Sequence, residues 1–345
     1  MPEENSPIIC IGKGMTNLSL QEQALHEELL SQRRAVPLGA GGRVPHGLGG
    51  VWPLPVGSAA PEYHPEDLVV TVPASLRIHE LESMLGAHRQ WSALTLPDHG
   101  QDSLGGVIAL ALEGWFRSPL FRDRILGLRV LTPAFGSITT GAKVVKSVAG
   151  YNLPRLFLGS RGALGVITEV TLRVSPRPPV QRVWVQDVMS PETSLDALRS
   201  TGIAWASLGF LRQSGRLLLT AVLTGHDTDD TLAHPLGPPA ATPLPPRLDP
   251  PAEGWLTYGS VPISRALALL RGWPPEQPLF LELTTGGFWG YVTDAAEAHL
   301  VRQCAAEMGG LASTPFLRPS SAPPPWWKTL KKSFDPDGCL WDPWE

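Results

Sequence analysis

Several short segments of this chain place apolar side chains at every second position, the pattern of a half-buried β-strand. GVITEVTLRV at 165–174 is the clearest, and LVVTVP at 68–73 is a second. ILGLRVLTPAFGSITTG at 125–141 predicts two strands joined by a tight turn at Phe135–Gly136. In the first of these segments the side chains predicted to share one face are Val166, Thr168, Val170, Leu172 and Val174.

Other segments repeat apolar positions at helical spacing. Ser19 and Glu22 form the pattern of a capping box ahead of several leucines, which predicts a helix from about 20 to 33. LRIHELESMLGAH at 76–88 predicts a second helix after the strand at 68–73. SLGGVIALALE at 103–113 predicts a third, opened by a pair of glycines.

The second half of the chain mixes strands and helices more loosely. Strands are predicted in VQRVWVQDV, RLLLTAVLT and PLFLELTTGGFWGYV. DAAEAHLVRQCAAEMGG predicts a helix capped by Asp294 and ended by Gly309. The apolar face predicted for this helix is Leu300, Val301, Cys304, Ala305 and Met308.

The predicted boundary between the two halves lies near residue 178. It gives one domain at 1–178 and another at 179–345. Within the second, 234–254 is too rich in proline for the interior of a helix or sheet, and we expect a long surface loop there. No internal repeat is visible.

Composition excludes several classes of protein. A formal net charge of −4 over 345 residues gives no reason to expect nucleic acid as a partner. No apolar run approaches the roughly 18 residues that a membrane helix needs, and the acidic start MPEENSP lacks the pattern of a signal peptide. The 3 cysteines, Cys10, Cys304 and Cys339, lie too far apart for a cysteine-ligated iron–sulfur cluster within the chain. We therefore expect a cytoplasmic protein.

Three glycine-rich loops are the candidates for ligand contact. GAGGR at 39–43 could form an anion-binding concavity from its N–H groups, or a tight turn between strands. SLGG at 103–106 would leave N–H groups unpaired at a helix start, where negative charge is favoured, or would serve packing. KVVKSVAGYNLPRLFLGSRGALG at 143–165 combines bare backbone with a lysine and a tyrosine, or is loop-rich core. None completes a P-loop or the Rossmann fingerprint.

Other catalytic chemistry lacks a motif. Histidines are scattered without metal-ligand spacing, so no metal site is predicted. His46 could attach a flavin or transfer a proton, although it is more simply a loop residue. Trp326–Trp327 is interpreted as packing or interface surface.

Taken together, the three loops carry a resemblance. The chain resembles flavoproteins of the vanillyl-alcohol-oxidase type, which share a PCMH-type FAD-binding domain, and within them the FAD-binding subunits of bacterial glycolate oxidases. The similar stretches cover nearly the whole chain: PLGAGGR, EYHPEDLVVTV, LPDHGQDSLGG, FRDRILGLRVL, GAKVVKSVAGYNLPRL, GSRGALGVITEVTLRVSPRP, LELTTGGFWGYV and LKKSFDPDGCLWDPW.

This resemblance implies an α+β fold, with a PCMH-type domain of two α+β subdomains and a smaller α+β cap from the second half. It implies bound FAD, noncovalent because Arg43 stands where some covalent flavoproteins have the attached histidine. Its glycine loops would supply N–H donors for the diphosphate and bare backbone for the ring system. The implied cofactor residues are Gly39, Ala40, Gly41, Gly42, Arg43, Asp98, His99, Gly100, Ser103, Leu104, Gly105, Gly106, Lys146, Gly150, Tyr151, Gly162, Gly165 and Ile167.

Three differences separate the chain from these relatives. Ser147 and Asn152 stand where relatives carry Asn and Asp, and WDPW replaces the usual Asn-Pro-Gly of the tail. The histidine-rich, glycine-aspartate metal motif of the related hydroxyacid-oxidising subunit is missing from the second half. Catalytic residues are therefore left unassigned, with Tyr258, Arg265 and Glu282 of the cap as candidates only.

The implied function is that of an FAD-binding subunit in a glycolate (2-hydroxyacid) oxidase complex. Its partners would be a catalytic FAD subunit and an iron–sulfur subunit, its substrate a small 2-hydroxyacid, and membrane association would come only through partners. Three alternatives stay open: a self-sufficient FAD-dependent alcohol or hydroxyacid oxidoreductase, a structural subunit that has lost catalysis, and an unrelated nucleotide-binding protein.

Overall fold

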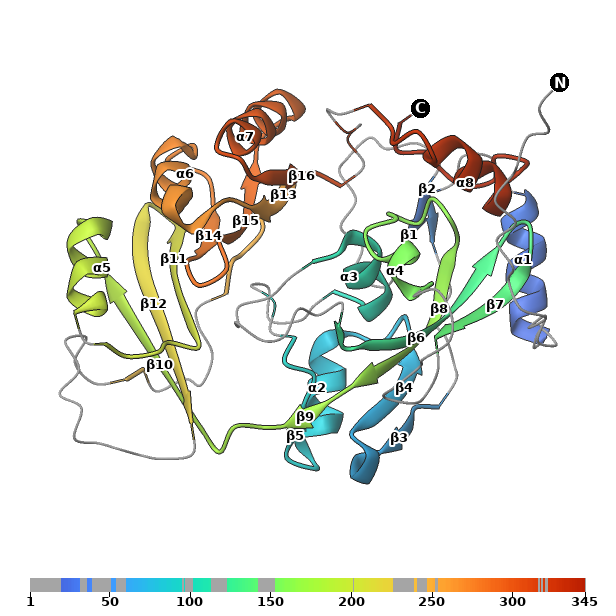
Figure 1. Cartoon of the computed structure of the whole chain (residues 1–345), viewed down its shortest axis with the longest axis horizontal. Helices are drawn as coiled ribbons and strands as arrows, with labels where there is room; N and C mark the ends of the chain where they lie inside the picture. Colours follow the sequence, from blue (N-terminus) through green and yellow to red (C-terminus); the bar gives the residue numbers. More distant parts are fainter. Residues whose placement is uncertain are drawn as a thin grey trace, which may run out of the picture.

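The chain forms two parts, each built on an antiparallel sheet (Figure 1). The part made mainly by the first half lies on the right of the view, and a seven-stranded sheet with its helices lies on the left. The structure is a computed structural model, and it describes residues 20–31, 36–38, 51–53, 60–94, 96, 102–112, 123–141, 153–200, 202–225, 239–240, 247–251, 254–315, 317, 319 and 322–344.

The first part is organised around a five-stranded antiparallel sheet. Its strands, in spatial order, are β3 (Glu62–His64), β4 (Val69–Pro73), β8 (Val166–Arg173), β6 (Ile125–Thr132) and β7 (Gly136–Gly141). The strands predicted at 68–73, 125–141 and 165–174 are confirmed, with a turn between β6 and β7. The central strands β4 and β8 pair Val70 with Leu172 and Val72 with Val170, all buried.

The simple two-faced prediction for β8 is wrong at Thr168. A register shift between β6 and β8 pairs Arg129 with Glu169 but Val130 with Ile167, so Thr168 has no opposite residue. Its carbonyl instead accepts the N–H of Ala74 at 3.0 Å. Such a bulge reverses the facing of the residues before it. As a result Ile167, not Val166, lies on the face that carries Val170 and Leu172.

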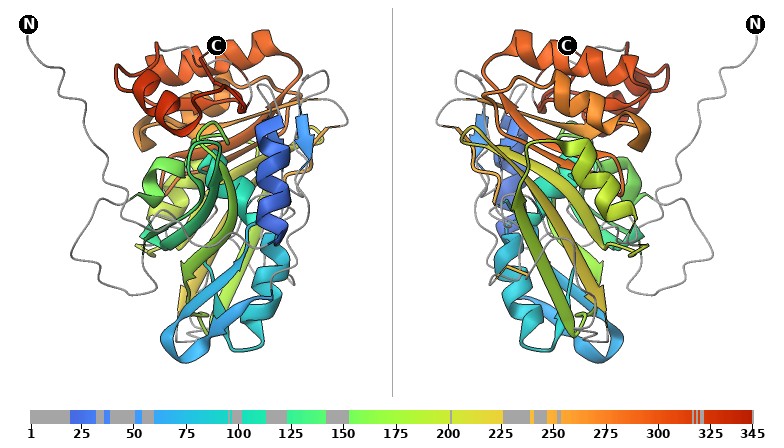
Figure 2. Two further views of the ribbon diagram at one scale, coloured as in Figure 1. Left: turned by 90° about the vertical axis from the view of Figure 1, so that its right-hand side faces the viewer. Right: turned by 90° about the vertical axis from the view of Figure 1, so that its left-hand side faces the viewer.

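Helices cover both faces of this sheet. One face packs against α2 (Ile78–Gly86), α3 (Leu104–Leu110) and α4 (Pro154–Phe157), where the core includes the fully buried side chains of Leu81, Val107 and Phe157. On the other face, Leu131 and Val166 pack against Leu29 of α1 (Leu20–Ser31). Figure 2 shows α1 upright alongside the sheet.

Two small pairings complete the first part. β1 (Val36–Leu38) pairs in parallel with β2 (Val51–Pro53). β5 (Gln90–Trp91) pairs antiparallel with β9 (Ser175–Pro176), which ties the segment leaving the first half back to the end of α2. A single turn of 3-10 helix, η1 (Pro65–Asp67), joins β3 to β4.

The second part is a seven-stranded antiparallel sheet with helices on one face (Figure 1). Its strands, in spatial order, are β10 (Val180–Asp187), β12 (Arg216–Gly225), β11 (Ser207–Gln213), β14 (Leu279–Glu282), β15 (Gly287–Val292), β13 (Trp255–Ser260) and β16 (Leu311–Ser313). The helical segments are α5 (Pro191–Arg199), η3 (Ile263–Arg265), α6 (Ala266–Gly272) and α7 (Ala295–Glu307).

Period-two alternation gives this sheet two apolar faces. Phe210 and Phe288 pack beneath the helices, whereas their neighbours Leu211 and Trp289 belong to the core of the first part. The seven-stranded sheet therefore lies between its own helices and the first half of the chain. Mixed helices and antiparallel sheets confirm the predicted α+β class.

Helix α7 forms where the sequence predicts it, with a different buried face. The Asp294 carboxylate accepts the N–H of Glu297 at 2.8 Å, which confirms the predicted cap. Leu300, however, is 58% exposed, and Cys304 is exposed too. Val301 and Ala305 are buried as predicted, and the helix also buries Ala298 and Arg302, so an arginine lies inside while Leu300 is exposed.

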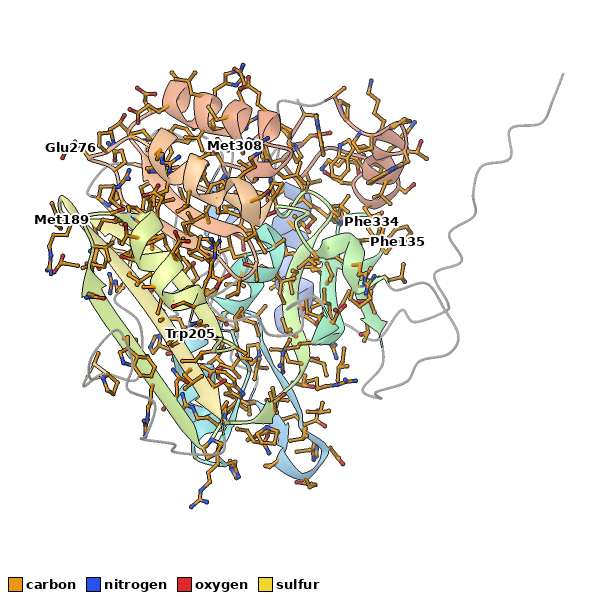
Figure 3. The ribbon with its side chains drawn as sticks, turned by 60° about the vertical axis from the view of Figure 1, so that its left-hand side comes forward. Phe135, Met189, Trp205, Glu276, Met308 and Phe334 are labelled. Atoms are coloured by element: carbon orange, nitrogen blue, oxygen red, sulfur yellow. The ribbon has the colours of Figure 1, made fainter. Side chains whose placement is uncertain are left out.

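Helix α8 (Trp327–Phe334) returns to the first half of the chain. Phe334 is buried, and its ring centroid lies 5.6 Å from that of Phe135 (Figure 3). The ring centroid of Phe157 lies 5.8 Å from that of Phe334. The residues after α8 continue onto the same part, because Cys339 and Leu340 share a cluster with Leu29. The boundary near residue 178 stays a prediction, and it did not include this return.

Candidate functional site

Most of the predicted cofactor residues lie outside the described residues. These are Gly39, Ala40, Gly41, Gly42, Arg43, Asp98, His99, Gly100, Lys146, Gly150 and Tyr151, together with the two departures Ser147 and Asn152. The described members are Ser103, Leu104, Gly105, Gly106, Gly162, Gly165 and Ile167. The described pieces of the site are the start of α3 and the loop before β8.

The backbone N–H groups of Leu104, Gly105 and Gly106, at the start of α3, are all hydrogen-bonded. Ser103 caps the helix by accepting the N–H of Gly106, at 3.3 Å. The N–H groups of Leu104 and Gly105 donate to the carbonyls of Leu76 and Ala74, at 2.9 and 2.8 Å. The expectation of unpaired donors at this helix start is therefore wrong, and contact of 103–106 with a cofactor stays a prediction that must rest on other atoms.

Packing requires a glycine at position 105, independently of any ligand. A Cβ at this position would lie 2.9 Å from the Cβ of Ala74, so only glycine lets α3 approach the end of β4 this closely. The same holds for Gly165, whose Cβ would lie 2.7 Å from Cγ1 of Val130 and 2.8 Å from the carbonyl oxygen of Leu131. Both of these glycines are required by the sheet, with or without a ligand.

The loop at 159–165 has a constrained backbone. Gly159, Arg161 and Gly162 all have positive φ, at 76°, 55° and 78°. The loop is held against the far end of α3, because the N–H groups of Gly159 and Arg161 donate to the carbonyls of Ile108 and Ala109, at 3.0 and 2.8 Å. The structure thus brings the predicted residues Gly162 and Gly165 onto the helix that Ser103 begins. Ile167 follows in β8 and packs against the core.

A buried polar atom sits in this loop. The hydroxyl of Ser160 is buried and has no hydrogen-bond partner in the described part of the chain. Leaving a buried hydroxyl unpaired costs about 1–3 kcal/mol, so native structures rarely retain one without a reason. Ser160 was not among the predicted residues, although it lies two residues before Gly162, which was.

Helix α8 supports the loop from behind. The ammonium of Lys331 donates to the carbonyl of Ala163 at 2.9 Å, to the carbonyl of Leu340 at 3.0 Å and to the carboxylate of Asp335 at 2.6 Å. Asp335 also accepts the N–H groups of Cys339 and Leu340. Lys331 of α8 and the FDPDG segment that follows it therefore hold the 159–165 loop in place, and we call this arrangement the clamp.

Polar side chains meet where the loop faces the seven-stranded sheet. The Arg161 guanidinium donates to the hydroxyl of Ser313 at 2.5 Å and to the carbonyl of Leu317 at 3.2 Å. The Tyr258 hydroxyl donates to the carbonyl of Leu110 at 2.5 Å. Burial lowers the pKa of Arg161 and raises that of Tyr258, whose shift the charge of Arg161 partly opposes. These bonds join the two parts of the molecule.

Of the three cap candidates, only Tyr258 lies at this contact. Arg265 is exposed in η3, on the helical side of the sheet. Glu282 is buried and accepts five hydrogen bonds, from Ser207 and Leu208 at the start of β11 and from Thr284 and Thr285 of its own turn, so its carboxylate is already engaged. Arg161 was missed because a lone arginine in a loop is usually a surface residue.

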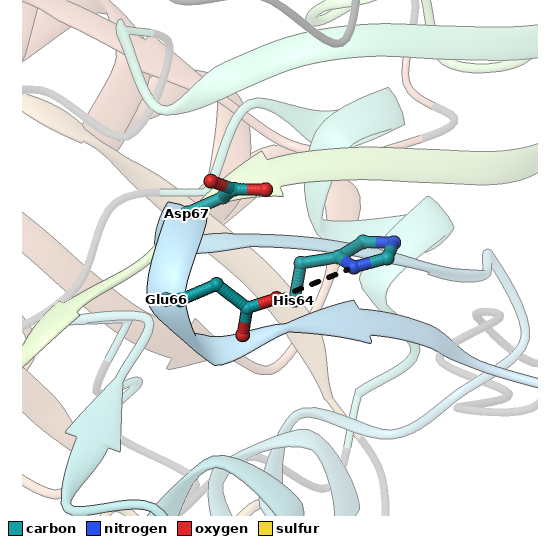
Figure 4. A group of neighbouring side chains, drawn as sticks. All are labelled: His64, Glu66 and Asp67. Atoms are coloured by element: carbon teal, nitrogen blue, oxygen red, sulfur yellow. Dashed lines mark ion pairs between the residues drawn. The ribbon is translucent and has the colours of Figure 1, made fainter.

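Among the residues that the structure describes, one group of potential metal ligands occurs elsewhere. His64, Glu66 and Asp67 place one ligand atom each within 4.8 Å of one another, at the turn between β3 and β4 (Figure 4). All three are exposed, and His64 pairs with Glu62 at 3.2 Å and with Glu66 at 3.9 Å. Exposed acidic side chains gather in this way on many protein surfaces, so we assign no ion to the turn.

Known proteins give a consistent comparison. The chain is 35% identical over 153 residues to the glycolate oxidase subunit GlcE of Escherichia coli (strain K12), covering 41% of this chain and 44% of that protein. It is 38% identical over 140 residues to the mitochondrial D-lactate dehydrogenase [cytochrome] of Arabidopsis thaliana, covering 40% of this chain and 24% of that protein. The chain thus spans less than half the length of these relatives. No family model matches it.

A solved structure extends the likeness to nearly the whole chain. The fold superposes on alkyldihydroxyacetonephosphate synthase with a TM-score of 0.63 and 15% identity, covering 94% of this chain and 75% of the other. At that identity the match establishes the fold alone. Together with the sequence similarity it confirms the resemblance expected from the glycine loops. None of the helices in the described part of the chain has the length and apolar character to cross a bilayer.

Proposed function

We propose that this chain binds FAD noncovalently and serves as the FAD-carrying subunit of a 2-hydroxyacid oxidoreductase of the glycolate oxidase type. Sequence similarity supports the reaction class, because one relative is named a glycolate oxidase subunit and the other a D-lactate dehydrogenase. Glycolate and D-lactate are both small 2-hydroxyacids. The fold shared with alkyldihydroxyacetonephosphate synthase supports a common architecture over 94% of the chain.

The observation that carries cofactor binding is the hydroxyl of Ser160, which is buried and has no partner among the residues that the structure describes. It lies in a loop of positive-φ residues that α3 and Lys331 hold in place. A rigid loop with a free donor and acceptor fits a large polar ligand, because no reorganisation is needed when the ligand binds. FAD, when bound, would supply the redox group through which this subunit takes part in hydroxyacid oxidation by the complex.

The remaining contacts follow the sequence motifs. We assign Gly39–Arg43 to the diphosphate, Asp98–Gly100 and Ser103–Gly106 to the flavin and its phosphates, and Lys146, Gly150, Tyr151, Gly162, Gly165 and Ile167 to the rest of the cofactor. At Ser103–Gly106 the contact would use side chains or shape, because the N–H groups are already bonded. No residue is assigned as the catalytic base.

The proposed role is that of a subunit. The 3 cysteines do not cluster, so an iron–sulfur centre that receives the electrons would belong to another chain. We expect that chain and a second, catalytic FAD subunit as partners, and a cytoplasmic location in which contact with a membrane is made through them.

The visible spectrum of the purified full-length chain tests this function. We expect a flavin spectrum and an equimolar amount of FAD released on denaturation. Added glycolate should leave the spectrum unchanged until the partner subunits are supplied. Bleaching by glycolate alone would favour a self-sufficient enzyme, and a colourless protein would contradict cofactor binding.

The variant Ser160→Ala tests whether the buried hydroxyl of Ser160 contributes to FAD binding. Loss of one hydrogen bond worth about 1 kcal/mol should weaken FAD retention by roughly fivefold, measured by equilibrium dialysis. Ser333→Ala is the matched control, because Ser333 is exposed on α8 and its hydroxyl bonds only within the helix. Equal FAD affinity in the two variants would remove Ser160 from the site.

A further inference from the structure

The hydroxyl of Ser160 is carried by a turn whose backbone is strained. The N–H of Ala163 donates to the carbonyl of Ser160 at 3.0 Å, which closes a turn of four residues at 160–163. Both central residues of the turn, Arg161 and Gly162, have positive φ, at 55° and 78°. An arginine adopts such a backbone only where the surrounding structure fixes it. We name residues 160–163 the Ser160 turn.

Two helices hold the Ser160 turn from different sides. From α3, the carbonyl of Ala109 accepts the N–H of Arg161 at 2.8 Å. From α8, the ammonium of Lys331 donates to the carbonyl of Ala163 at 2.9 Å. Lys331 is only 8% exposed, so its bond to the turn lies away from bulk water. The strained turn is thus fixed at its second residue by one helix and at its last residue by the other.

Lys331 is itself fixed in one arrangement. Its ammonium also donates to the carboxylate of Asp335 at 2.6 Å and to the carbonyl of Leu340 at 3.0 Å. An ammonium has three N–H donors, and here each donor has an acceptor. A displaced Ala163 carbonyl would leave a buried donor of Lys331 unpaired, which is unfavourable. The lysine therefore opposes movement of the turn.

We propose that Lys331 is a positioning residue for the cofactor, which keeps the Ser160 turn in the conformation that FAD binds. The inference rests on the proposed function for the identity of the ligand. In this role Lys331 acts through the carbonyl of Ala163 rather than by touching the ligand. A loop that is already held in its bound conformation loses less conformational entropy when the ligand binds, so removal of Lys331 weakens binding.

A role in stability alone is the competing explanation, because Lys331 also neutralises the buried carboxylate of Asp335. The ion pair uses one N–H donor of the ammonium, whereas another is directed at the turn. The two explanations differ in what they predict. A stability role lowers the fraction of folded protein and leaves the FAD affinity of the folded molecules unchanged. A positioning role lowers that affinity itself.

Equilibrium dialysis of FAD against the full-length protein tests the inference, at a temperature where circular dichroism shows every variant to be folded. We expect Lys331→Met to weaken FAD binding by about tenfold or more. Lys332→Met, at the exposed neighbouring position, should bind FAD like the wild type. Leu269→Ala should do so as well. It is the control for stability, because Leu269 is a core residue of α6 on the helical side of the seven-stranded sheet.

Two further variants keep the test decisive if Lys331→Met does not fold. Lys331→Met combined with Asp335→Asn removes both charges, so no buried charge is left unpaired, and the Ala163 carbonyl still lacks its donor. This double variant should show the same loss of FAD affinity. Lys331→Arg keeps a cation beside Asp335 and a donor near the turn, and it should recover most of the affinity.

A double-mutant cycle shows whether Lys331 acts through the Ser160 turn. Ser160→Ala should weaken FAD binding by roughly fivefold in the wild type and by less than about twofold in the Lys331→Met background, because the hydroxyl is no longer held in place. Hydrogen exchange of the FAD-free protein gives a readout that needs no ligand. The peptide that contains residues 159–165 should exchange faster in Lys331→Met than in Leu269→Ala.

The outcomes separate the positioning role from the function on which it rests. Wild-type FAD affinity in the Lys331 variants, an equal loss of affinity in Leu269→Ala, or additive effects of Ser160→Ala and Lys331→Met would each overturn the positioning role alone. A wild-type protein that binds no FAD would reject the proposed function, and with it any role of Lys331 toward the cofactor.

Discussion

Gly165 shows that a glycine in a cofactor motif can be required by the fold itself. A Cβ there would meet both a side chain and a carbonyl of β6. We expect Gly165→Ala to lower the free energy of unfolding by about 1–3 kcal/mol, because neither neighbour can move freely. Urea denaturation measures this. Gly272→Ala is the control, since a Cβ at Gly272 meets nothing within 4 Å; equal stability of the two variants would contradict the packing explanation.

The buried carboxyl of Glu82 should make the free energy of unfolding depend on pH. Burial raises the pKa of this carboxyl, against the lowering effects of Ser92, Arg177 and Arg124. The folded state then holds the proton more tightly than the unfolded state, whose pKa is near 4.5, so stability from this group falls as pH rises between the two values. The cost is fully present above the raised pKa of the folded state, and it is relieved on acidification through that window.

The variant Glu82→Gln should remove the contribution of Glu82 to the pH dependence of stability. The free energy of unfolding, measured by urea denaturation at a series of pH values, should fall less steeply above pH 4.5 in the variant than in the wild type. Glu276→Gln changes an exposed glutamate and should follow the wild type. Parallel curves for the wild type and Glu82→Gln would rule out the predicted dependence.

Local sequence rules predicted the structural roles of some single residues and missed those of others. Asp294 was predictable as a cap because its hydrogen bond reaches only three residues ahead. The bulge at Thr168 was not, because it depends on the pairing of Arg129 and Val130 with β8. Arg302 was missed because α7 is rich in alanine on several sides, so the apolar pattern admits more than one buried face.

Among the elements, α8 is the one whose role depends most on distant residues. Lys331 is 8% exposed and is bonded to Asp335, whose carboxylate is fully buried. Lys331→Met should cost about 3–5 kcal/mol, because it leaves that carboxylate without its cation. Thermal and urea denaturation measure the loss. Lys332→Met, at the exposed neighbouring position, should change stability by less than about 0.5 kcal/mol.

The strands were predictable element by element, whereas the position of α8 was not. Period-two alternation marks a strand without reference to its partners, and the turn at Phe135 needs only local chemistry. A lysine in WWKTLKKSF gives no such signal. Its burial depends on the carbonyl of Ala163, which is 168 residues away in sequence. The glycine loops were recognised only through resemblance, and most of the site they imply lies outside the described residues.

One core cluster extends across the two parts of the molecule. The same cluster contains Val170 of the five-stranded sheet and Phe280 and Trp289 of the seven-stranded sheet. We therefore expect one cooperative unfolding transition, with tryptophan fluorescence and far-UV circular dichroism giving the same midpoint. Phe280→Ala should shift both midpoints together. Two separate transitions would mean that the halves unfold independently.

The clamp made by α8 also has a consequence for the order of events during synthesis. The loop at 159–165 leaves the ribosome long before Lys331, which completes its support. At roughly 5–20 residues per second, a separation of 168 residues is a delay on the order of 10–30 s. Through that interval Phe157 lacks the ring of Phe334 that covers it in the finished protein. The nascent first half is therefore a natural substrate for chaperones until α8 emerges.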